Sequence, residues 1–177
     1  SVVTDGTARF TILTPRLLRL EWSATGTFED RGSYAFPTRH AAAPPLSVAR
    51  DAGVLEVDTG ALTLRYVRDS GRFTGENLSI RFEFDGRRVA WVPGMPNAGN
   101  LRGTRRTLDG CEGDAALDEG LLSCEGWSLF DDSGSVLFDP DDGWVTPPRD
   151  HDLQDWYFFA YGHDYKGALD EYARFGG

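Results

Sequence analysis

Apolar and polar residues alternate with a period of two along most of this chain, and turn-forming residues interrupt the alternation at short intervals. In "RLLRLEW", Leu18, Leu20 and Trp22 alternate with Arg19 and Glu21, and "SIRFEF" repeats the pattern. A period of two places successive side chains on opposite faces of a strand. These segments therefore predict strands with one dry face.

The turn clusters between these segments define the expected fold class. Motifs such as "TDGT", "RDSGR", "FDGRR" and "DPDDG" join Gly to Asp, Ser or Pro. About ten strands linked in this way, with no helix-length pattern between them, favour an all-β fold with a two-sheet antiparallel β-sandwich. The continuous apolar run "QDWYFFAYG" predicts a central strand covered on both faces, a cover that two stacked sheets can provide.

Only the last segment, "HDYKGALDEYARFGG", predicts a helix. Asp164 can cap its start and Gly176 can end it. Its expected apolar stripe follows the helical spacing i, i+3, i+4, i+7 and consists of Tyr165, Ala168, Leu169 and Tyr172. We therefore divide the chain into a sandwich, residues 1–162, and a terminal helix, residues 163–177. Because the chain begins without Met and stops after this helix, we expect it to be a fragment of a longer protein.

The charge of the chain argues against two classes of partner. It carries 28 acidic and 18 basic residues, a formal net charge of -10. Such a charge repels a phosphate backbone and an anionic lipid surface. No apolar run approaches the roughly 20 residues that span a bilayer. We expect no nucleic-acid partner and no membrane partner.

Residues that could carry catalysis are present, but not in catalytic patterns. The pairs "ED" and "DD" and the run "DPDDG" lie in turn clusters, where acidic residues form turns and stay solvated. Two cysteines are too few for a four-ligand zinc site, and no G-x-S-x-G nucleophile motif occurs. The histidines lack the spacing of metal ligands: His40, His151 and His163. The sequence predicts no catalytic residue, no metal and no cofactor.

Five tryptophans raise the question of a sugar-stacking platform, because a flat aromatic face suits the apolar face of a pyranose ring. Trp22 and Trp156 continue apolar stripes, and we expect both to be buried. Trp144, in the polar stretch "DDGWVTPPRD", is the best candidate for an outward position. A free carbohydrate-binding module is therefore one possible function, and it predicts that Trp144→Ala abolishes sugar binding.

Several long segments together resemble one family. "FTILTPRLLRLEWSATGTFEDRGS", "NLRGTRRTLDG", "DEGLLSCEGWSLFDDS" and "DWYFFAYGHDYKGALDEYARFGG" are similar to consecutive segments of the N-terminal domain of glycoside hydrolase family 31. The resemblance implies a β-sandwich of the galactose-mutarotase-like (supersandwich) kind, with the terminal helix as the connector to a (β/α)8 catalytic barrel. The nucleophile segment of that barrel has no counterpart in this chain, so the resemblance implies a non-catalytic domain of an α-glycosidase.

The same resemblance suggests where substrate would be contacted. In the family, a loop leaves the sandwich and reaches over the mouth of the barrel, and residues 108–119, "LDGCEGDAALDE", resemble it. Asp109 is the best candidate for a hydrogen bond to a sugar hydroxyl, because a carboxylate accepts from hydroxyls and Gly110 permits close approach. With Glu112 and Trp144 these residues form the predicted carbohydrate-binding set. The loop base is expected to be anchored by arginines that pair with carboxylates: Arg102, Arg105 and Arg106.

Two further points stay open from the sequence. Cys111 and Cys124 could staple the two ends of the loop as a disulfide, or could remain two thiols. A mutarotase-like enzyme is a further alternative, since it shares the expected fold, but it needs a histidine and a carboxylate that face one cleft. The implied partners are the chain's own catalytic barrel and a carbohydrate substrate, and the preferred sugar is not specified.

Overall fold

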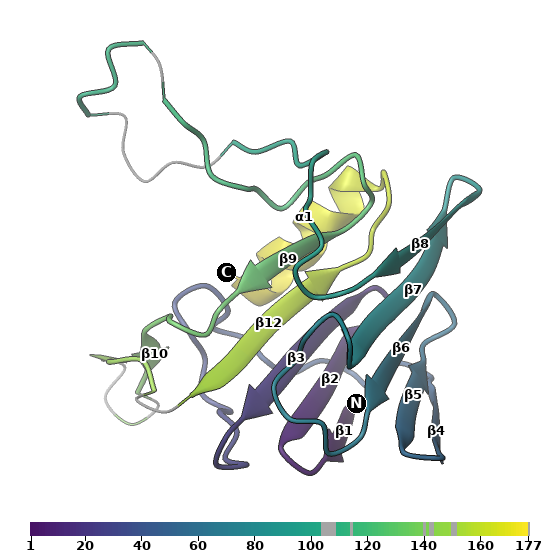
Figure 1. Cartoon of the computed structure of the whole chain (residues 1–177). Helices are drawn as coiled ribbons and strands as arrows, with labels where there is room; N and C mark the ends of the chain where they lie inside the picture. Colours follow the sequence, from purple (N-terminus) through teal and green to yellow (C-terminus); the bar gives the residue numbers. More distant parts are fainter. Residues whose placement is uncertain (104–108, 114, 140, 142–143, 150–151, 177) are drawn as a thin grey trace.

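The chain folds into two five-stranded antiparallel sheets that pack face to face, and a terminal helix lies on the outer face of one sheet (Figure 1). The computed structural model describes residues 1–103, 109–113, 115–139, 141, 144–149 and 152–176. This architecture confirms the prediction of an all-β sandwich.

The first sheet has the strand order β1-β2-β3-β12-β9, with bounds Val2–Asp5, Ala8–Thr14, Leu17–Ser23, Leu153–Phe159 and Ser128–Asp131. The second sheet has the order β4-β5-β6-β7-β8, with bounds Ser47–Asp51, Val54–Asp58, Leu62–Val67, Leu78–Phe84 and Arg87–Trp91. A short ribbon pairs β10 with β11, Leu137–Phe138 with Val145–Thr146, and α1 is the helix Tyr165–Gly176. Consecutive strands therefore pair through short turns within each sheet, apart from β12, which returns to lie between β3 and β9.

The turn between β7 and β8 shows how the turn residues act. Asp85 and Gly86 have φ angles of 49° and 72°. Two successive positive φ angles belong to the tight hairpin turn whose twist matches that of its strands, and Asp-Gly is a preferred pair for it. The "FDGRR" motif therefore sets the register in which Phe84 lies opposite Arg87.

Apolar side chains of both sheets meet in one core. Phe10, Leu20 and Phe158 reach it from the first sheet, and Leu64 and Ile80 reach it from the second, all without exposed surface. These residues occupy alternate positions along their strands, as the period of two predicts. Burial of their apolar surface is the main contribution that holds the sheets together.

A second core lies on the opposite face of the first sheet. Leu17, Tyr157 and Phe159 point to this face and pack against Phe36 and, from α1, Phe175. The run that contains Tyr157 is therefore a central strand covered on both faces, as predicted. The cover on this side is a helix and a loop segment, and not a stacked sheet of the kind suggested by the sequence.

Helix α1 begins as predicted but buries a different stripe. The Asp164 carboxylate accepts a hydrogen bond from the Gly167 amide at 3.1 Å, which caps the helix start. Ala168 and Phe175 are buried, while Leu169 is 50 % exposed. The prediction that Leu169 belongs to the buried face is wrong, because the helix presents Ala168 and Phe175, seven positions apart, to the sheet.

The tryptophan predictions are confirmed only in part. Trp144 is 74 % exposed, as expected for an outward side chain. Trp22 and Trp156 are half-buried at the margin of the core, so the expectation that they are buried is wrong. The fully enclosed tryptophans are Trp91 and Trp127, which pack with Phe158. Within the described part of the chain, no helix has the length and apolarity needed to cross a membrane.

Candidate functional site

The loop that follows β8 leaves the body of the sandwich and projects from it (Figure 1). The two ends of the loop are joined at Asn100. The Asn100 side-chain amide donates to the Gly120 carbonyl and accepts from the Gly120 amide, both at 2.8 Å. The Leu101 amide also donates to the Leu122 carbonyl at 2.9 Å. A side chain that pairs with both the backbone N–H and the backbone C=O of one residue fixes the orientation of that residue.

Arg102 anchors the loop base, but not in the predicted way. Its backbone has a φ of 56°, and its guanidinium donates to the Leu117 carbonyl at 2.9 Å. Among the residues that the structure describes, no ion pair joins Arg102 to a carboxylate. Arg105 and Arg106 lie outside the described residues. A side chain at position 120 would also meet the Arg102 carbonyl at 2.7 Å, so glycine is required there.

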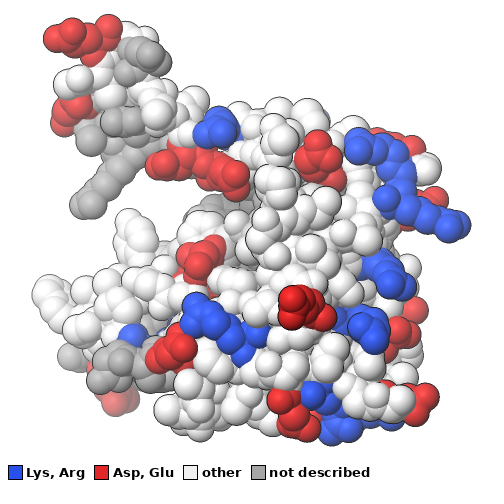
Figure 2. All heavy atoms as spheres, in the orientation of Figure 1, with Lys and Arg blue, Asp and Glu red and all other residues white. Residues whose placement is uncertain are grey.

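The predicted sugar-contacting residues lie toward the end of this loop. Asp109, Gly110 and Glu112 are exposed, and Gly110 has a φ of 72°, in the region that favours glycine. The acidic side chains of the loop, which also include Asp118 and Glu119, gather on the projection (Figure 2). The loop thus offers carboxylate oxygens, which accept hydrogen bonds, to whatever lies beyond it.

Trp144, the fourth predicted binding residue, stands on a different element. It precedes β11, and its carbonyl accepts a hydrogen bond from the Asp139 amide at 2.6 Å. The loop base is attached at the start of β9, where Ser128 donates to the Leu121 carbonyl, and the β10–β11 ribbon follows the end of β9. The loop and the ribbon stand apart in Figure 1, and Figure 2 shows a hollow between the projection and the body. The ribbon that Trp144 precedes is therefore separate from the loop.

The two cysteines do not form the disulfide that was one of the open alternatives. Cys111 is a half-buried thiol and Cys124 an exposed one. The Cys124 sulfur instead accepts a hydrogen bond from the Tyr165 hydroxyl at 3.8 Å. The loop ends are therefore held by Asn100 rather than by a covalent bond.

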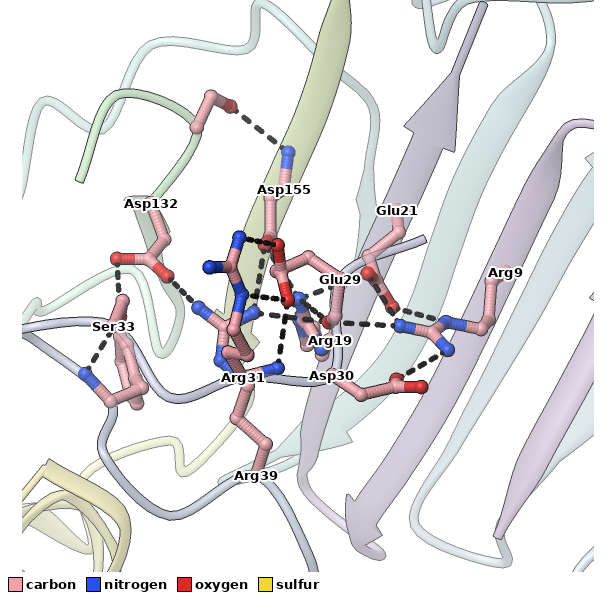
Figure 3. Close-up of polar contacts among 12 residues, drawn as sticks. Arg9, Arg19, Glu21, Glu29, Asp30, Arg31, Ser33, Arg39, Asp132 and Asp155 are labelled. Carbon is pink, nitrogen blue, oxygen red and sulfur yellow. Dashed lines mark hydrogen bonds and ion pairs between the residues drawn. The ribbon is translucent and has the colours of Figure 1, made fainter. Parts of the chain in front are cut away.

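A buried ionic cluster lies on the outer face of the first sheet, beneath the segment that follows β3 (Figure 3). At its centre the Asp155 carboxylate accepts from three guanidinium groups. Arg19 donates at 2.7 and 2.8 Å, Arg149 at 3.0 Å and Arg39 at 3.2 Å. Burial by itself raises the pKa of Asp155, but the hydrogen bonds and charge of Arg19, with the other arginines, bring it down to about 2. Asp155 is therefore held ionised.

The surrounding carboxylates share these arginines. Glu21 pairs with Arg9 at 2.7 Å, and Asp132 pairs with Arg39 at 2.8 Å and accepts from the Ser33 hydroxyl at 2.9 Å. Burial raises the pKa of Glu21 and of Asp132, because their partners do not fully replace the water that they lose. The expectation that the "DD" pair is solvated is wrong for Asp132, which has no exposed surface.

This cluster was not found from the sequence. The alternation in β3 correctly separated Arg19 from its apolar neighbours, but it could not show that Arg19 faces a second buried layer. The available signal was Asp155, a carboxylate at the start of an otherwise apolar central strand. A charge in such a place requires a partner. The cluster ties the segment at residues 28–39 to the sheet, which is a structural role.

His163 is the one described histidine in a polar cleft. Its Nδ1 lies 2.7 Å from the Asp85 carboxylate and its Nε2 lies 3.2 Å from the Cys124 carbonyl. A histidine and a carboxylate therefore share a cleft, which is the first requirement of the mutarotase-like alternative. Both ring nitrogens already contact protein groups, however, whereas a catalytic base needs a ring nitrogen within reach of the substrate proton. Among the described residues, no group of three His, Cys, Asp or Glu side chains is placed to hold a metal ion.

The fold and these contacts define a class of protein: a two-sheet antiparallel β-sandwich whose outer face is closed by a terminal helix and an ion-paired segment, with one projecting loop. No protein-family model matches the sequence, and no curated protein matches it. Fourteen solved chains match in structure. One is a GH31 dextranase from Flavobacterium johnsoniae, solved in complex with glucose.

The likeness to the dextranase is one of fold. The two chains are 14 % identical with a TM-score of 0.52, and the match covers 100 % of this chain and 27 % of the dextranase chain. This chain therefore spans about a quarter of the length of the enzyme that it matches.

Proposed function

We propose that this chain is the non-catalytic N-terminal β-sandwich of a family 31 glycoside hydrolase, and that it supports a catalytic barrel and lends one loop to the sugar-binding site. The observation that carries the proposal is the structural match, in which the whole chain corresponds to 27 % of a GH31 dextranase chain. The family segments in the sequence, which run in the same order along the chain, support the same assignment independently of the fold.

An exposed apolar face supports the first role. Tyr34, Phe130, Phe138 and Tyr172 line an open cavity of about 550 Å³ beside the end of α1. Tyr34 is 74 % exposed and Phe130 36 % exposed. Contiguous apolar patches of this kind are typical of surfaces that bind another protein surface. In this proposal the barrel covers the apolar face formed by these four residues.

The projecting loop supports the second role. Its ends are fixed by Asn100 and Arg102, while its acidic residues are exposed on the projection. A loop that is rigid at its base and extended at its tip can present Asp109 to a ligand held by a neighbouring domain. The catalytic carboxylates of a retaining α-glycosidase would then come from the barrel.

The test is to express residues 1–177 alone and joined to the catalytic barrel that the proposal places after residue 177. The proposal expects the longer protein to hydrolyse α-glycosides and the shorter one to show no hydrolysis. Within the longer protein, Asp109→Asn is expected to raise KM about tenfold with little change in kcat, as for a lost charged hydrogen bond to substrate. The matched control is Asp51→Asn, an exposed carboxylate on strand β4, which should leave both constants unchanged.

Two results would overturn the proposal. Hydrolysis by residues 1–177 alone would make the chain an enzyme in its own right. Saturable sugar binding by residues 1–177 that Trp144→Ala abolishes would favour an independent carbohydrate-binding module, because the domain would then recognise its ligand without a barrel.

A further inference from the structure

A second polar cleft lies between the ends of the two sheets, away from the loop tip. It has a volume of about 640 Å³ and is lined from four chain segments. The first sheet contributes the turn at Arg16 and the link from β12 to α1, and the second contributes the turn at Gly60 and the end of β7. This volume falls within the range of roughly 300–1,000 Å³ that small-ligand sites occupy.

The charged groups of the cleft are paired. Arg16 and Asp164 approach to 3.5 Å, and His163 and Asp85 to 2.7 Å. The remaining carboxylate of the lining, Glu83, lies 3.5 Å from an arginine on β8. The lining holds three carboxylates and one arginine, and His163 adds a positive charge only when it is protonated, so the cleft does not attract a phosphate.

The exposure of these pairs leaves them open to a ligand. The Arg16 and Asp164 side chains are 48 % and 54 % exposed, and those of His163 and Asp85 are 44 % and 63 % exposed. The first pair faces the cleft beside the ring of Tyr161, whose hydroxyl is fixed by Thr14 at 3.0 Å. The cleft thus combines donors, acceptors and one immobile aromatic ring.

We propose that this cleft binds a neutral polyhydroxy ligand the size of a mono- or disaccharide. A hydroxyl group both donates and accepts. It can therefore bind the Asp164 carboxylate and the Arg16 guanidinium together without disturbing their charge balance. The carbon-bound hydrogens of a sugar ring can lie on the ring of Tyr161. This site does not depend on the proposed catalytic partner, since residues 109–113 of the loop contribute nothing to its lining.

The test is an amide NMR titration of residues 1–177 with maltose up to about 100 mM, the range needed to detect millimolar binding. The proposal expects saturable shifts at Gly60 and Gly162, and weaker binding of glucose 6-phosphate, whose phosphate the carboxylates of the lining repel. Arg16→Gln should weaken maltose binding about tenfold, since it removes a charged donor. The matched control is Arg72→Gln, because Arg72 forms a similarly exposed ion pair with Asp152 outside the cleft. This variant should bind maltose as tightly as the native chain does.

Three results would overturn this inference: no shifts at the highest concentration, tighter binding of glucose 6-phosphate than of maltose, or equal loss of binding in both variants. Shifts confined to Trp144 and residues 109–113 would also overturn it, and would instead point to the loop and the ribbon. Because the two sets of reporter amides do not overlap, failure of the cleft and failure of the loop proposal can be told apart.

Discussion

Asp155 is a single buried carboxylate that accepts hydrogen bonds from three guanidinium groups. The charges of these three arginines are compensated in part by this carboxylate. Removal of its charge would leave Arg19, Arg39 and Arg149 facing one another in a space without water. Breaking a buried ion pair by removing one partner costs more than the pair contributes, because the remaining charge is uncompensated. The carboxylate is therefore the residue on which the cluster is built.

We predict that Asp155→Asn lowers the free energy of unfolding by about 3–5 kcal/mol, the range for a broken buried pair. The measurement is urea denaturation followed by tryptophan fluorescence. Asp30→Asn is the matched control, because Asp30 also pairs with an arginine of the cluster, at 2.7 Å, but is 72 % exposed. It should cost less than about 1 kcal/mol. Equal costs for the two variants would contradict this account.

At the scale of elements, the segment after β3 closes the outer face of the first sheet. The Phe36 ring stacks on Tyr157 with centroids 3.6 Å apart and also meets Tyr172 of α1 edge to face. The segment therefore joins the helix to the sheet, while the ionic cluster holds its other end. Tyr34, two residues earlier on the same segment, is exposed.

Phe36→Ala is predicted to destabilise the protein by about 3–5 kcal/mol, as a fully buried aromatic side chain does when truncated. Tyr34→Ala, on the same segment, should change stability by less than about 0.5 kcal/mol, as for an exposed site. Thermal unfolding followed by circular dichroism compares the two variants. A neutral Phe36→Ala variant would show that the segment does not hold α1 to the sheet.

The Asn100 side chain makes several of the contacts that close the base of the loop after β8. We predict that Asn100→Ala increases hydrogen exchange at the Gly120 and Arg102 amides, because both donate to the Asn100 oxygen at 2.8 Å. Asn100→Asp is the matched variant, because it keeps the accepting oxygen and loses only the donor to the Gly120 carbonyl. In this variant, hydrogen exchange at the Gly120 and Arg102 amides should stay closer to that of the native chain. Unchanged exchange in Asn100→Ala would mean that other contacts close the loop.

At the scale of the whole molecule, two groups of carboxylates should make the stability of the fold depend on pH in opposite directions. The folded pKa of Asp155 and of Glu29 is about 2; Arg31 lowers the latter through a hydrogen bond. Their contribution is present above the ordinary pKa near 4 and is lost as pH falls toward 2. Burial raises the folded pKa of Glu21 and Asp132, so the folded state gains protons there and becomes more stable as pH falls through those values.

Because the two groups of carboxylates act in opposite directions, we predict that the free energy of unfolding is largest at mildly acidic pH, above about 4. Urea unfolding measured at intervals from about pH 3 to pH 8 would locate it. In Asp132→Asn, which cannot ionise, the decline in stability on the neutral side of the maximum should be shallower than in the native chain. A native stability that rises steadily up to pH 8 would contradict the assignment of raised pKa values to Glu21 and Asp132.

The apolar face formed by Tyr34, Phe130, Phe138 and Tyr172 should govern association of the isolated chain. We predict concentration-dependent self-association in sedimentation velocity, because exposed apolar surface drives contact between copies. Tyr34→Glu and Phe130→Glu should reduce it. Val2→Glu, which changes an apolar residue that is 61 % exposed on strand β1, should leave it unaltered. A monomer at all concentrations would contradict the prediction.

Several features of the molecule could be predicted from local patterns. The period of two predicted the strands, "FDGRR" a hairpin turn, Asp164 the start of the helix, and "DWYFF" a central strand covered on both faces. Each of these depends on residues close together in the chain. The exposure of Trp144 could be predicted for the same reason, because its neighbours are polar turn residues.

The rest required contacts between distant segments. Local pattern could not show that the polar face of β3 is buried, because the cover comes from residues 28–39 and from α1. Asp155, which accepts two hydrogen bonds from Arg19, lies on β12, 136 positions away. For the same reason local pattern could not show that His163 meets Asp85, or that Leu169 rather than Phe175 faces water. The sequence by itself determined the strands, their turns and the sandwich, since these follow from alternation along the chain. The tertiary structure alone decided which charges are buried and paired, because burial depends on what packs over a face.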